Sequence, residues 1–181
     1  MKVRPVIVLL LVWLGGCARD NRHVLLISTA DQQMFLLRDN IKIAEFPVST
    51  SKFGVGDALN SHATPTGLLR VRKKIGKNAP PGAVFKSRRR TGEVLPVDAP
   101  GRDPIVTRIL WLEGLEPQNR NAYGRYIYIH GTPEERNIGT ATSYGCIRMR
   151  SVDVITVYDT VGLGARVLIT TRPFKRAEQI Q

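Results

Sequence analysis

Short apolar runs separated by turn residues constrain the fold of this chain more than any other feature of its sequence. The runs are rich in Val, Ile, Leu and aromatic residues, and they predict strands over residues 24–28, 34–37, 41–48, 68–72, 105–112, 126–130 and 165–170. One segment, residues 151–161, reads as a helix: Ser151 can cap it, Asp153 suits its first turn, and Gly162 follows its end. The sequence therefore predicts a mainly β domain, a packed pair of sheets with one short helix.

Two long segments, residues 50–65 and 73–104, contain many Gly, Pro, Ser and Lys residues and are predicted as loops. Loops of this length in a compact domain are usually functional or mobile. The sequence has no internal repeat. Once an N-terminal leader is removed, roughly 165 residues remain, which is enough for one domain with its own core. We therefore expect one folded domain over residues 23–171 and a polar tail over residues 172–181.

The N-terminus has the pattern of an export signal. Lys2 and Arg4 precede an apolar run, residues 5–14, that is too short to cross a bilayer comfortably. The sequence Leu14-Gly15-Gly16-Cys17 resembles a bacterial lipobox, in which cleavage leaves the cysteine as the first residue with diacylglycerol on its sulfur. We therefore predict a lipoprotein signal peptide over residues 1–16, a lipidated Cys17 and a short tether over residues 17–22. An ordinary signal peptide and an uncleaved anchor are the alternatives.

The predicted anchor also indicates a location. Ala18 follows the cysteine, whereas lipoproteins kept at the inner membrane of diderm bacteria usually carry Asp at that position. We therefore expect an exported, monomeric protein of the cell envelope, held by lipid at the periplasmic face of the outer membrane.

The net charge of +12 is unevenly distributed along the chain. One stretch without acidic residues contains Arg70, Arg72, Lys73, Lys74, Lys77, Lys86, Arg88, Arg89 and Arg90. Because an exported protein rarely meets nucleic acid, we expect no nucleic-acid partner; anionic envelope polymers or the carboxylates of cell-wall peptides fit the charge better. A solvated basic loop without a ligand is the alternative.

Cys146 is the only cysteine left for chemistry if Cys17 carries lipid, and it lies sixteen residues after His130. A free thiol has a pKa of about 8.5, so only a few per cent is thiolate at neutral pH. A neighbouring imidazole can take the proton and so activate the thiol as a nucleophile. A buried structural cysteine near an unrelated histidine is the alternative.

The residues around this pair favour the catalytic interpretation. His130 ends a predicted strand, and the polar segment 133–142 can return the chain to Ser143-Tyr144-Gly145-Cys146 beside it. Gly145 permits a tight turn whose amides can hold an oxyanion. Arg148 can pair with a substrate carboxylate, or form a structural salt bridge with Asp153. We expect the pair at the rim of the β domain, under a loop that runs from residue 73 to about 102, with the sulfur and an imidazole nitrogen near hydrogen-bonding distance.

These motifs resemble a known family. His130-Gly131-Thr132 followed by Ser143-x-Gly145-Cys146-Ile147-Arg148 is similar to the signature of L,D-transpeptidases with the YkuD-type catalytic domain. The similarity runs from about residue 24 to residue 170 and includes Val48-Ser49-Thr50, Thr64-Pro65-Thr66-Gly67 and Gly164-Ala165-Arg166-Val167.

The resemblance implies a YkuD-like β-sandwich and a role for each motif residue. Cys146 would be the nucleophile and His130 the base, and the carbonyl of Gly131 would orient the imidazole. Amides around Gly145 and Cys146 would bind the oxyanion. Tyr144 stands where the family usually has histidine; that position lines the pocket beside Ser143 and leaves the implied mechanism intact.

The resemblance also implies a reaction on peptidoglycan stem peptides, and thereby a part in cell-wall biogenesis and cell shape. Cys146 would attack the carbonyl of the third stem residue, expel D-alanine and form a thioester, which an acceptor amine resolves. Water as acceptor would make the protein an L,D-carboxypeptidase or hydrolase. A non-catalytic wall-binding lipoprotein of the same fold is the remaining alternative.

Other chemistries are disfavoured by spacing. Sortase-type transpeptidases place the histidine much farther upstream of the cysteine, and NlpC-type peptidases place the cysteine first. No cluster has metal-ligand spacing and no glycine motif binds nucleotide, so we expect neither a metal nor a cofactor. His62 is expected to be a surface histidine, although it could touch substrate, and His23 a bystander near the tether.

Overall fold

The computed structural model describes residues 19–174, so the predicted signal peptide, Cys17 and residues 175–181 lie outside the described residues. The strands are β1 (His23–Ser28), β2 (Gln33–Arg38), β3 (Ile41–Pro47), β4 (Gly67–Ile75), β5 (Ala83–Lys86), β6 (Arg89–Val94), β7 (Ile105–Gly114), β8 (Tyr128–Gly131), β9 (Ile147–Met149) and β10 (Arg166–Thr170). The α-helix is α1 (Ser151–Thr160), and two short 3₁₀ turns are η1 (Pro117–Asn119) and η2 (Glu135–Asn137). No helix within residues 19–174 is long and apolar enough to cross a membrane.

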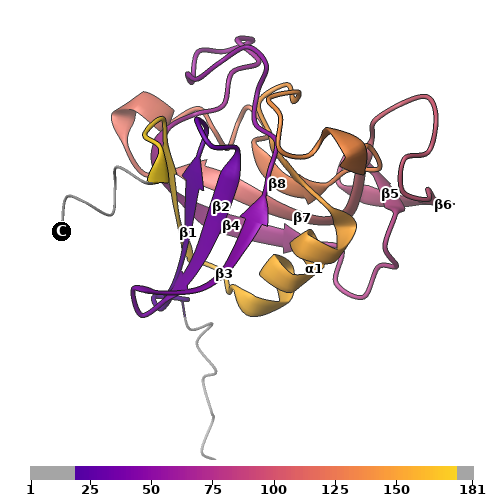
Figure 1. Ribbon diagram of the computed structural model, residues 1–181, viewed down its shortest axis with the longest axis horizontal. Helices are drawn as coiled ribbons and strands as arrows, with labels where there is room; N and C mark the ends of the chain where they lie inside the picture. Colours follow the sequence, from indigo (N-terminus) through magenta and orange to yellow (C-terminus); the bar gives the residue numbers. More distant parts are fainter. Residues whose placement is uncertain (1–18, 175–181) are drawn as a thin grey trace, which may run out of the picture.

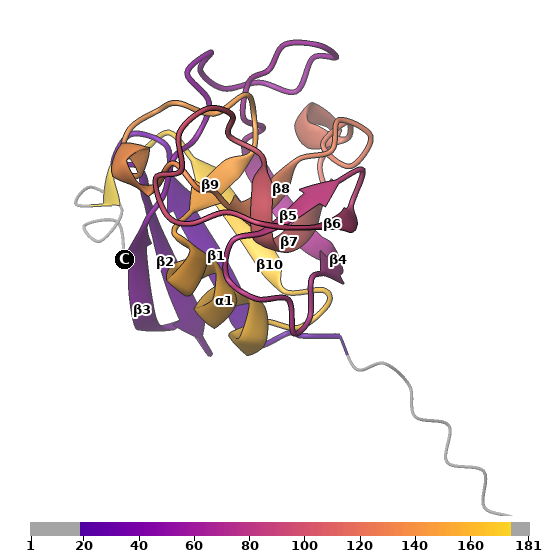
Figure 2. The ribbon, with the colours of Figure 1, turned by 90° about the vertical axis from the view of Figure 1, so that its right-hand side faces the viewer.

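The strands form one hydrogen-bonded sheet in the order β3-β2-β1-β10-β4-β7-β5-β6, with β8 paired to β7 and β9 paired to β8. The sheet curls, so that β1, β2 and β3 form one layer and β7, β8 and β9 another, and α1 packs against β7 and β8 (Figures 1 and 2). The prediction of a mainly β sandwich with one α-helix after the cysteine is confirmed. The two layers are continuous through β10 and β4 rather than separate sheets.

The space between the layers is the main hydrophobic core. Strand alternation sends every second side chain inward, as Leu25 and Ile27 of β1 and Val167 and Ile169 of β10 show; all four are at most 1% exposed. Helix α1 contributes Val154 and Val157 to the same core, three residues apart on one face. Because both layers bury apolar residues here, the sheet edges that carry the candidate site are held at fixed positions.

The segment predicted as the loop 73–104 contains structure that the sequence did not indicate. Strand β4 extends to Ile75, and β5 and β6 form an antiparallel hairpin. Its turn places Ser87 and Arg88 at φ 49° and 66°, a conformation that usually selects Gly or Asn. Without either residue, the sequence Lys86-Ser87-Arg88-Arg89 gives no hairpin signal.

The capping prediction for the helix is wrong. Arg150 occupies the N-cap position and makes no side-chain cap, while Ser151 is already helical. The Ser151 hydroxyl instead lies 2.8 Å from the Thr107 hydroxyl, and its N–H donates to Glu135. Asp153 lies in the first turn and Gly162 follows the end, as the sequence suggested.

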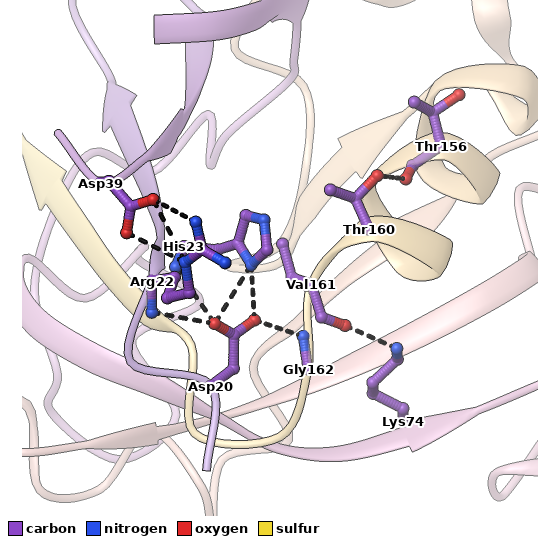
Figure 3. Close-up of polar contacts among 9 residues, drawn as sticks. All are labelled: Asp20, Arg22, His23, Asp39, Lys74, Thr156, Thr160, Val161 and Gly162. Atoms are coloured by element: carbon purple, nitrogen blue, oxygen red, sulfur yellow. Dashed lines mark hydrogen bonds and ion pairs between the residues drawn. The ribbon is translucent and has the colours of Figure 1, made fainter. Parts of the chain in front are cut away.

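Both ends of the described chain are bonded into the domain. Asp20, in the predicted tether, accepts hydrogen bonds from the N–H groups of Gly162 (2.6 Å) and His23 (3.1 Å) and lies 2.9 Å from the imidazole of His23 (Figure 3). Phe174, in the predicted polar tail, is buried and stacks on Phe35 with ring centroids 3.9 Å apart. The packed domain therefore extends beyond residues 23–171 at both ends.

The hydrogen bonds of Asp20 allow a test of how firmly the segment before β1 is held to the domain. Burial alone would raise the pKa of this carboxyl, but the N–H groups of Gly162, His23 and Arg22 hold it below its usual value. Hydrogen bonds to a charged group contribute about 1–3 kcal/mol, so Asp20→Ala should lower the free energy of unfolding by that order at pH 7. This difference in the free energy of unfolding should become smaller in acid. The pKa of Asp20 is depressed in the folded state, so the stabilisation by its charged form is lost as the pH falls through that pKa.

Urea denaturation of the two proteins at pH 7 and pH 3 measures this difference. Asp39→Asn is the matched control: the Asp39 side chain makes an exposed ion pair with Arg22, and asparagine tolerates the φ of 51° at this position. An Asp20→Ala effect no larger than that of Asp39→Asn would contradict the assignment.

Candidate active site

The parallel pair β8–β9 brings the two motifs together (Figure 2). Ile129 is paired with Ile147 and His130 with Arg148. Paired residues of neighbouring strands point to the same face, and faces alternate along each strand. Ile129 and Ile147 therefore enter the core, while His130 and Arg148 emerge on the opposite face, where Cys146 also lies just before β9.

His130 is held in one tautomer. Its Nδ1 lies 2.8 Å from the carbonyl oxygen of Gly131, which can only accept, so Nδ1 carries the proton and Nε2 keeps its lone pair. The side chain is only 4% exposed. This hydrogen bond to the Gly131 carbonyl is the contact that the family resemblance implied.

Cys146 is partly exposed, and its sulfur donates to the carbonyl of Tyr126 over 3.4 Å. Among residues 19–174, the thiol donates a hydrogen bond to this carbonyl and makes no hydrogen bond with His130. Both side chains nevertheless line one cavity of about 240 Å³. The sulfur and the imidazole thus share a pocket in a resting arrangement that is not yet joined by a hydrogen bond.

Burial keeps both members of the pair neutral. Desolvation lowers the pKa of His130 to about 4, with Arg148 adding to the shift and the Gly131 carbonyl and Asp103 opposing it. Desolvation raises the pKa of the Cys146 thiol to about 11, although the Tyr128 backbone, Arg148 and Arg125 each favour the thiolate. At a pH between these two pKa values, the site holds a neutral thiol and a neutral imidazole.

The turn before Cys146 is fixed by hydrogen bonds from both sides. The Ser143 hydroxyl donates to the Cys146 carbonyl (2.6 Å) and accepts the N–H of Gly145 (3.2 Å). The Thr64 hydroxyl donates to the Gly145 carbonyl (3.1 Å). Gly145 has φ 114°, and a Cβ there would lie 3.2 Å from the Ala63 carbonyl, so glycine is required. In this state the Gly145 amide is already engaged, and within residues 19–174 the Cys146 amide has no acceptor.

Arg148 forms a structural ion pair, but not with the partner that the sequence suggested. Its Nη2 lies 2.6 Å from Oδ2 of Asp103, and both side chains are nearly buried, at 12% and 13% exposure. The contact is an ion pair only, because among the described residues no N–H or O–H group is aligned for a hydrogen bond to Oδ2 of Asp103. The other oxygen, Oδ1, accepts a hydrogen bond from the Thr132 hydroxyl. Asp153, on α1, is not the partner. The guanidinium therefore stands at the pocket wall with its charge compensated.

The segment 50–65 covers the cysteine turn from the other side. It lies at the top of the ribbon, away from α1 (Figure 1). The N–H of Lys52 donates to the Ser143 carbonyl (3.1 Å), and the N–H of Ser143 donates to the Thr50 carbonyl (2.9 Å). From segment 73–104, Arg88 of the β5–β6 hairpin lies 4.9 Å over the ring of Tyr126, which lines the second cavity described below.

Cys146 and Tyr144 each line two pockets. The cavity described above is lined by Asp103, Ile105, His130, Ser143, Tyr144, Cys146 and Arg148. A second cavity, of about 260 Å³, is lined by Leu59, Asn60, His62, Gly124, Arg125, Tyr126, Ile127, Tyr144 and Cys146. The thiol therefore lies between two neighbouring cavities.

Several residues of this site were missing from the sequence prediction. No sequence motif marks Asp103, Tyr126 or Lys52. Their positions in the site depend on contacts between segments that are far apart in the sequence. His62, expected mainly at the surface, is exposed but lines the second cavity and meets Tyr144 edge-on at 5.8 Å. His23 contacts Asp20 (Figure 3) and lines neither cavity. Within residues 19–174 no three His, Cys, Asp or Glu side chains form a metal site.

The β sandwich thus presents a Cys–His pair on the wall of one pocket. Residues 22–169 match the YkuD family, the L,D-transpeptidase catalytic domain. The chain belongs to this family.

Relatives in Escherichia coli K12 support the assignment. The chain is 34% identical over 107 residues to the probable L,D-transpeptidase YbiS, covering 58% of this chain and 31% of that protein. It is 31% identical over 137 residues to the probable L,D-transpeptidase YcfS, covering 74% of this chain and 39% of that protein. The matched regions thus span well under half the length of these relatives.

Solved structures share the fold. An L,D-transpeptidase from Mycobacterium smegmatis superposes with a TM-score of 0.56 at 19% identity, over 82% of this chain and 58% of that one. L,D-transpeptidase 3 from Mycobacterium tuberculosis, in complex with a faropenem-derived adduct, gives 0.54 at 18% identity, over 82% and 60%.

The neutral pair makes a pH prediction. Alkylation of Cys146 by iodoacetamide should rise about tenfold per pH unit between pH 7 and 10, because the reagent needs the thiolate and the pKa is raised. Peptide-level mass analysis of Cys146 alkylation, with glutathione as the reference thiol, measures this profile. A rate that is already constant from pH 6 to 8 would instead indicate a preformed thiolate–imidazolium pair.

Proposed function

We propose that the protein is a cysteine-dependent peptidoglycan L,D-transpeptidase that acts through a thioester on stem peptides. The observation that carries the proposal is the shared pocket of Cys146 and His130, in which Nδ1 is fixed by the Gly131 carbonyl and Nε2 is free to accept a proton. Family membership supports the same activity.

The first half-reaction follows from the protonation states. The sulfur of Cys146 forms a bond to the carbonyl carbon of the third stem residue while Nε2 of His130 takes the thiol proton. The carbonyl electron pair moves to oxygen and gives a tetrahedral oxyanion. Collapse breaks the C–N bond to D-alanine, whose nitrogen receives the proton from His130, and a thioester remains.

The second half-reaction reverses these proton transfers. An acceptor amine attacks the thioester carbonyl, His130 removes a proton from the nitrogen, and the departing sulfur receives it. With the side-chain amine of a neighbouring stem as acceptor, the product is a cross-link. The two cavities that meet at Cys146 support separate positions for donor and acceptor. Water as acceptor would give L,D-carboxypeptidase activity instead.

The oxyanion would be held mainly by the Cys146 amide. That N–H has no acceptor within the described residues, whereas the Gly145 amide donates to Ser143. A preformed amide donor stabilises the developing charge without reorganisation. The Gly145 amide could contribute only if its 3.2 Å bond to Ser143 is exchanged for the oxyanion.

Acylation by a carbapenem tests the nucleophile and the base. One structural neighbour carries a faropenem-derived adduct, so a β-lactam is a suitable substrate mimic. We expect one covalent adduct on Cys146, none in Cys146→Ala, and acylation slowed roughly a hundredfold in His130→Ala, because general base assistance is lost. Intact-protein mass and stopped-flow kinetics measure these outcomes.

The product distinguishes the alternatives. Purified muropeptides incubated with the protein should give a cross-linked dimer by mass analysis; a shortened stem alone would identify a carboxypeptidase. An adduct that persists in Cys146→Ala would exclude the proposed nucleophile, and an absence of any adduct or product would favour a wall-binding protein.

We also propose that Cys17 carries lipid and holds the domain at the periplasmic face of the outer membrane. The lipobox-like sequence before Cys17 supports the anchor, and Ala18 supports the choice of membrane. Because Asp20 is bonded to Gly162, only residues 17–19 would separate the acylated sulfur from the folded domain. The domain would therefore work within about 10 Å of chain length from the lipid.

Signal processing checks this anchor. Globomycin should cause the precursor to accumulate, and Cys17→Ser should release or misprocess the protein while carbapenem acylation of Cys146 persists. Membrane fractions and blots measure both effects. Unchanged processing and membrane retention in Cys17→Ser would instead indicate a conventional signal or an uncleaved anchor.

A further inference from the structure

The cations around the thiol differ in whether they have an anionic partner. Arg148 is paired with Asp103, and Arg125 is paired with Asp57 at 3.0 Å with both side chains at most 7% exposed. These two guanidinium groups are compensated within the protein, so neither is free to bind an anionic substrate at full strength.

Lys52 is the exposed cation of the site. Within residues 19–174 no carboxylate lies within ion-pair distance of it, and its Nζ lies 2.9 Å from the hydroxyl of Tyr144. The ammonium also stands over two rings, 4.4 Å from the centroid of Tyr144 and 5.3 Å from that of Phe53. Cation–π contacts of this kind hold a lysine in place without neutralising it.

The position of Lys52 is fixed by the backbone as well as by these rings. Its N–H is bonded to the Ser143 carbonyl, one residue before Tyr144. The neighbouring Ser51 is anchored through its N–H to the Thr64 hydroxyl (3.0 Å) and through its hydroxyl to the His62 carbonyl (2.6 Å). Lys52 and Tyr144 are therefore parts of one braced unit, and Tyr144 lines both cavities together with Cys146.

The chemistry of the pair suits one class of ligand. An ammonium has three protons, of which the Tyr144 oxygen accepts one, so two remain for an anion. The Tyr144 proton is then available to the same anion. The ammonium lowers the pKa of the Tyr144 hydroxyl, which makes that hydroxyl a stronger donor. A planar carboxylate can accept from both groups at once.

Arg88 is the other cation near the thiol without a carboxylate partner among the described residues, and its contacts are different. Its guanidinium lies 5.1 Å from the Trp111 ring and 4.9 Å from the Tyr126 ring, and it bonds the Tyr128 hydroxyl at 3.4 Å. The guanidinium packs against these rings and is partly buried, whereas Lys52 is exposed. Lys52 is therefore the better candidate for an anion that arrives from solvent.

We infer that Lys52 and Tyr144 form a carboxylate-binding subsite that holds a free carboxylate of the peptide substrate beside Cys146. The inference rests on the proposed function for the identity of the peptide, since stem peptides carry free carboxylates. It gives a specific role to Tyr144, which departs from the usual family residue. The Tyr144 side chain positions the Lys52 ammonium and shares the bound carboxylate with it.

Binding of peptide acids and amides tests the subsite without requiring turnover. The full chain with Cys146→Ala is titrated calorimetrically with a stem tetrapeptide and with two analogues, one amidated at the C-terminus and one at the side-chain carboxylate. The tetrapeptide should bind about tenfold more tightly than the analogue whose recognised carboxylate is amidated, as expected for a charge-assisted hydrogen bond. The analogue that loses affinity identifies the carboxylate.

Variants in the same background assign the effect. Lys52→Gln should abolish the preference for the acid, and Tyr144→Phe, which keeps the ring, should reduce it to a few fold. Lys42→Gln is the matched control: it removes the same charge from an exposed lysine that pairs with Glu45 on β3, and it should keep the full preference.

The outcomes separate this inference from the proposed function. Equal binding of all three peptides, binding of none, or an acid preference that survives Lys52→Gln would overturn the subsite. A preference that Lys52→Gln removes, in a protein whose intact Cys146 form makes no product from muropeptides, would support the subsite and refute the transpeptidase assignment alone.

Discussion

The site depends on the register of one short parallel strand pair. Ile129 and Ile147 are fully buried and pair across β8 and β9, and each contributes about 1.5–3 kcal/mol by leaving water. A slip of one residue in either strand would turn an isoleucine out to solvent and send His130 or Cys146 toward the core. The hydrophobic core therefore fixes the side on which Cys146 and His130 lie, without any hydrogen bond between their side chains.

Most of the fold, and the placement of Cys146 and His130 in one pocket, could be predicted from the sequence, because both depend on local signals. Alternating apolar runs indicated β1, β2, β3, β4, β7, β8 and β10, and the family resemblance marked His130 and Cys146. Three-residue β9 has too few positions to show a period, and the turn at Ser87 and Arg88 lacks the usual residues. The partner of Arg148 could not be predicted, because Asp103 lies 45 residues away in sequence and meets it only through tertiary packing.

Burial and charge compete at the thiol, and burial wins. Arg148 and Arg125 both favour a thiolate, yet the pKa of Cys146 is raised, because the desolvation of the sulfur is the larger effect. Desolvation also lowers the pKa of His130, so the imidazole rests neutral with the lone pair of Nε2 free. The ion pairs thus shape the pocket wall without creating a reactive anion in the resting state.

A neutral resting thiol has a consequence in the proposed envelope location. Oxidants and disulfides react with the thiolate, so a cysteine with a raised pKa and a bond to the Tyr126 carbonyl is protected while no substrate is bound. In the proposed envelope location Cys146 has no partner thiol in its own chain once Cys17 is acylated, and slow oxidation would preserve activity. In the proposed mechanism, activation would then require a carbonyl close enough for proton transfer to His130 to accompany S–C bond formation. Positioning of the substrate by contacts outside the Cys–His pair would become the step that controls the chemistry.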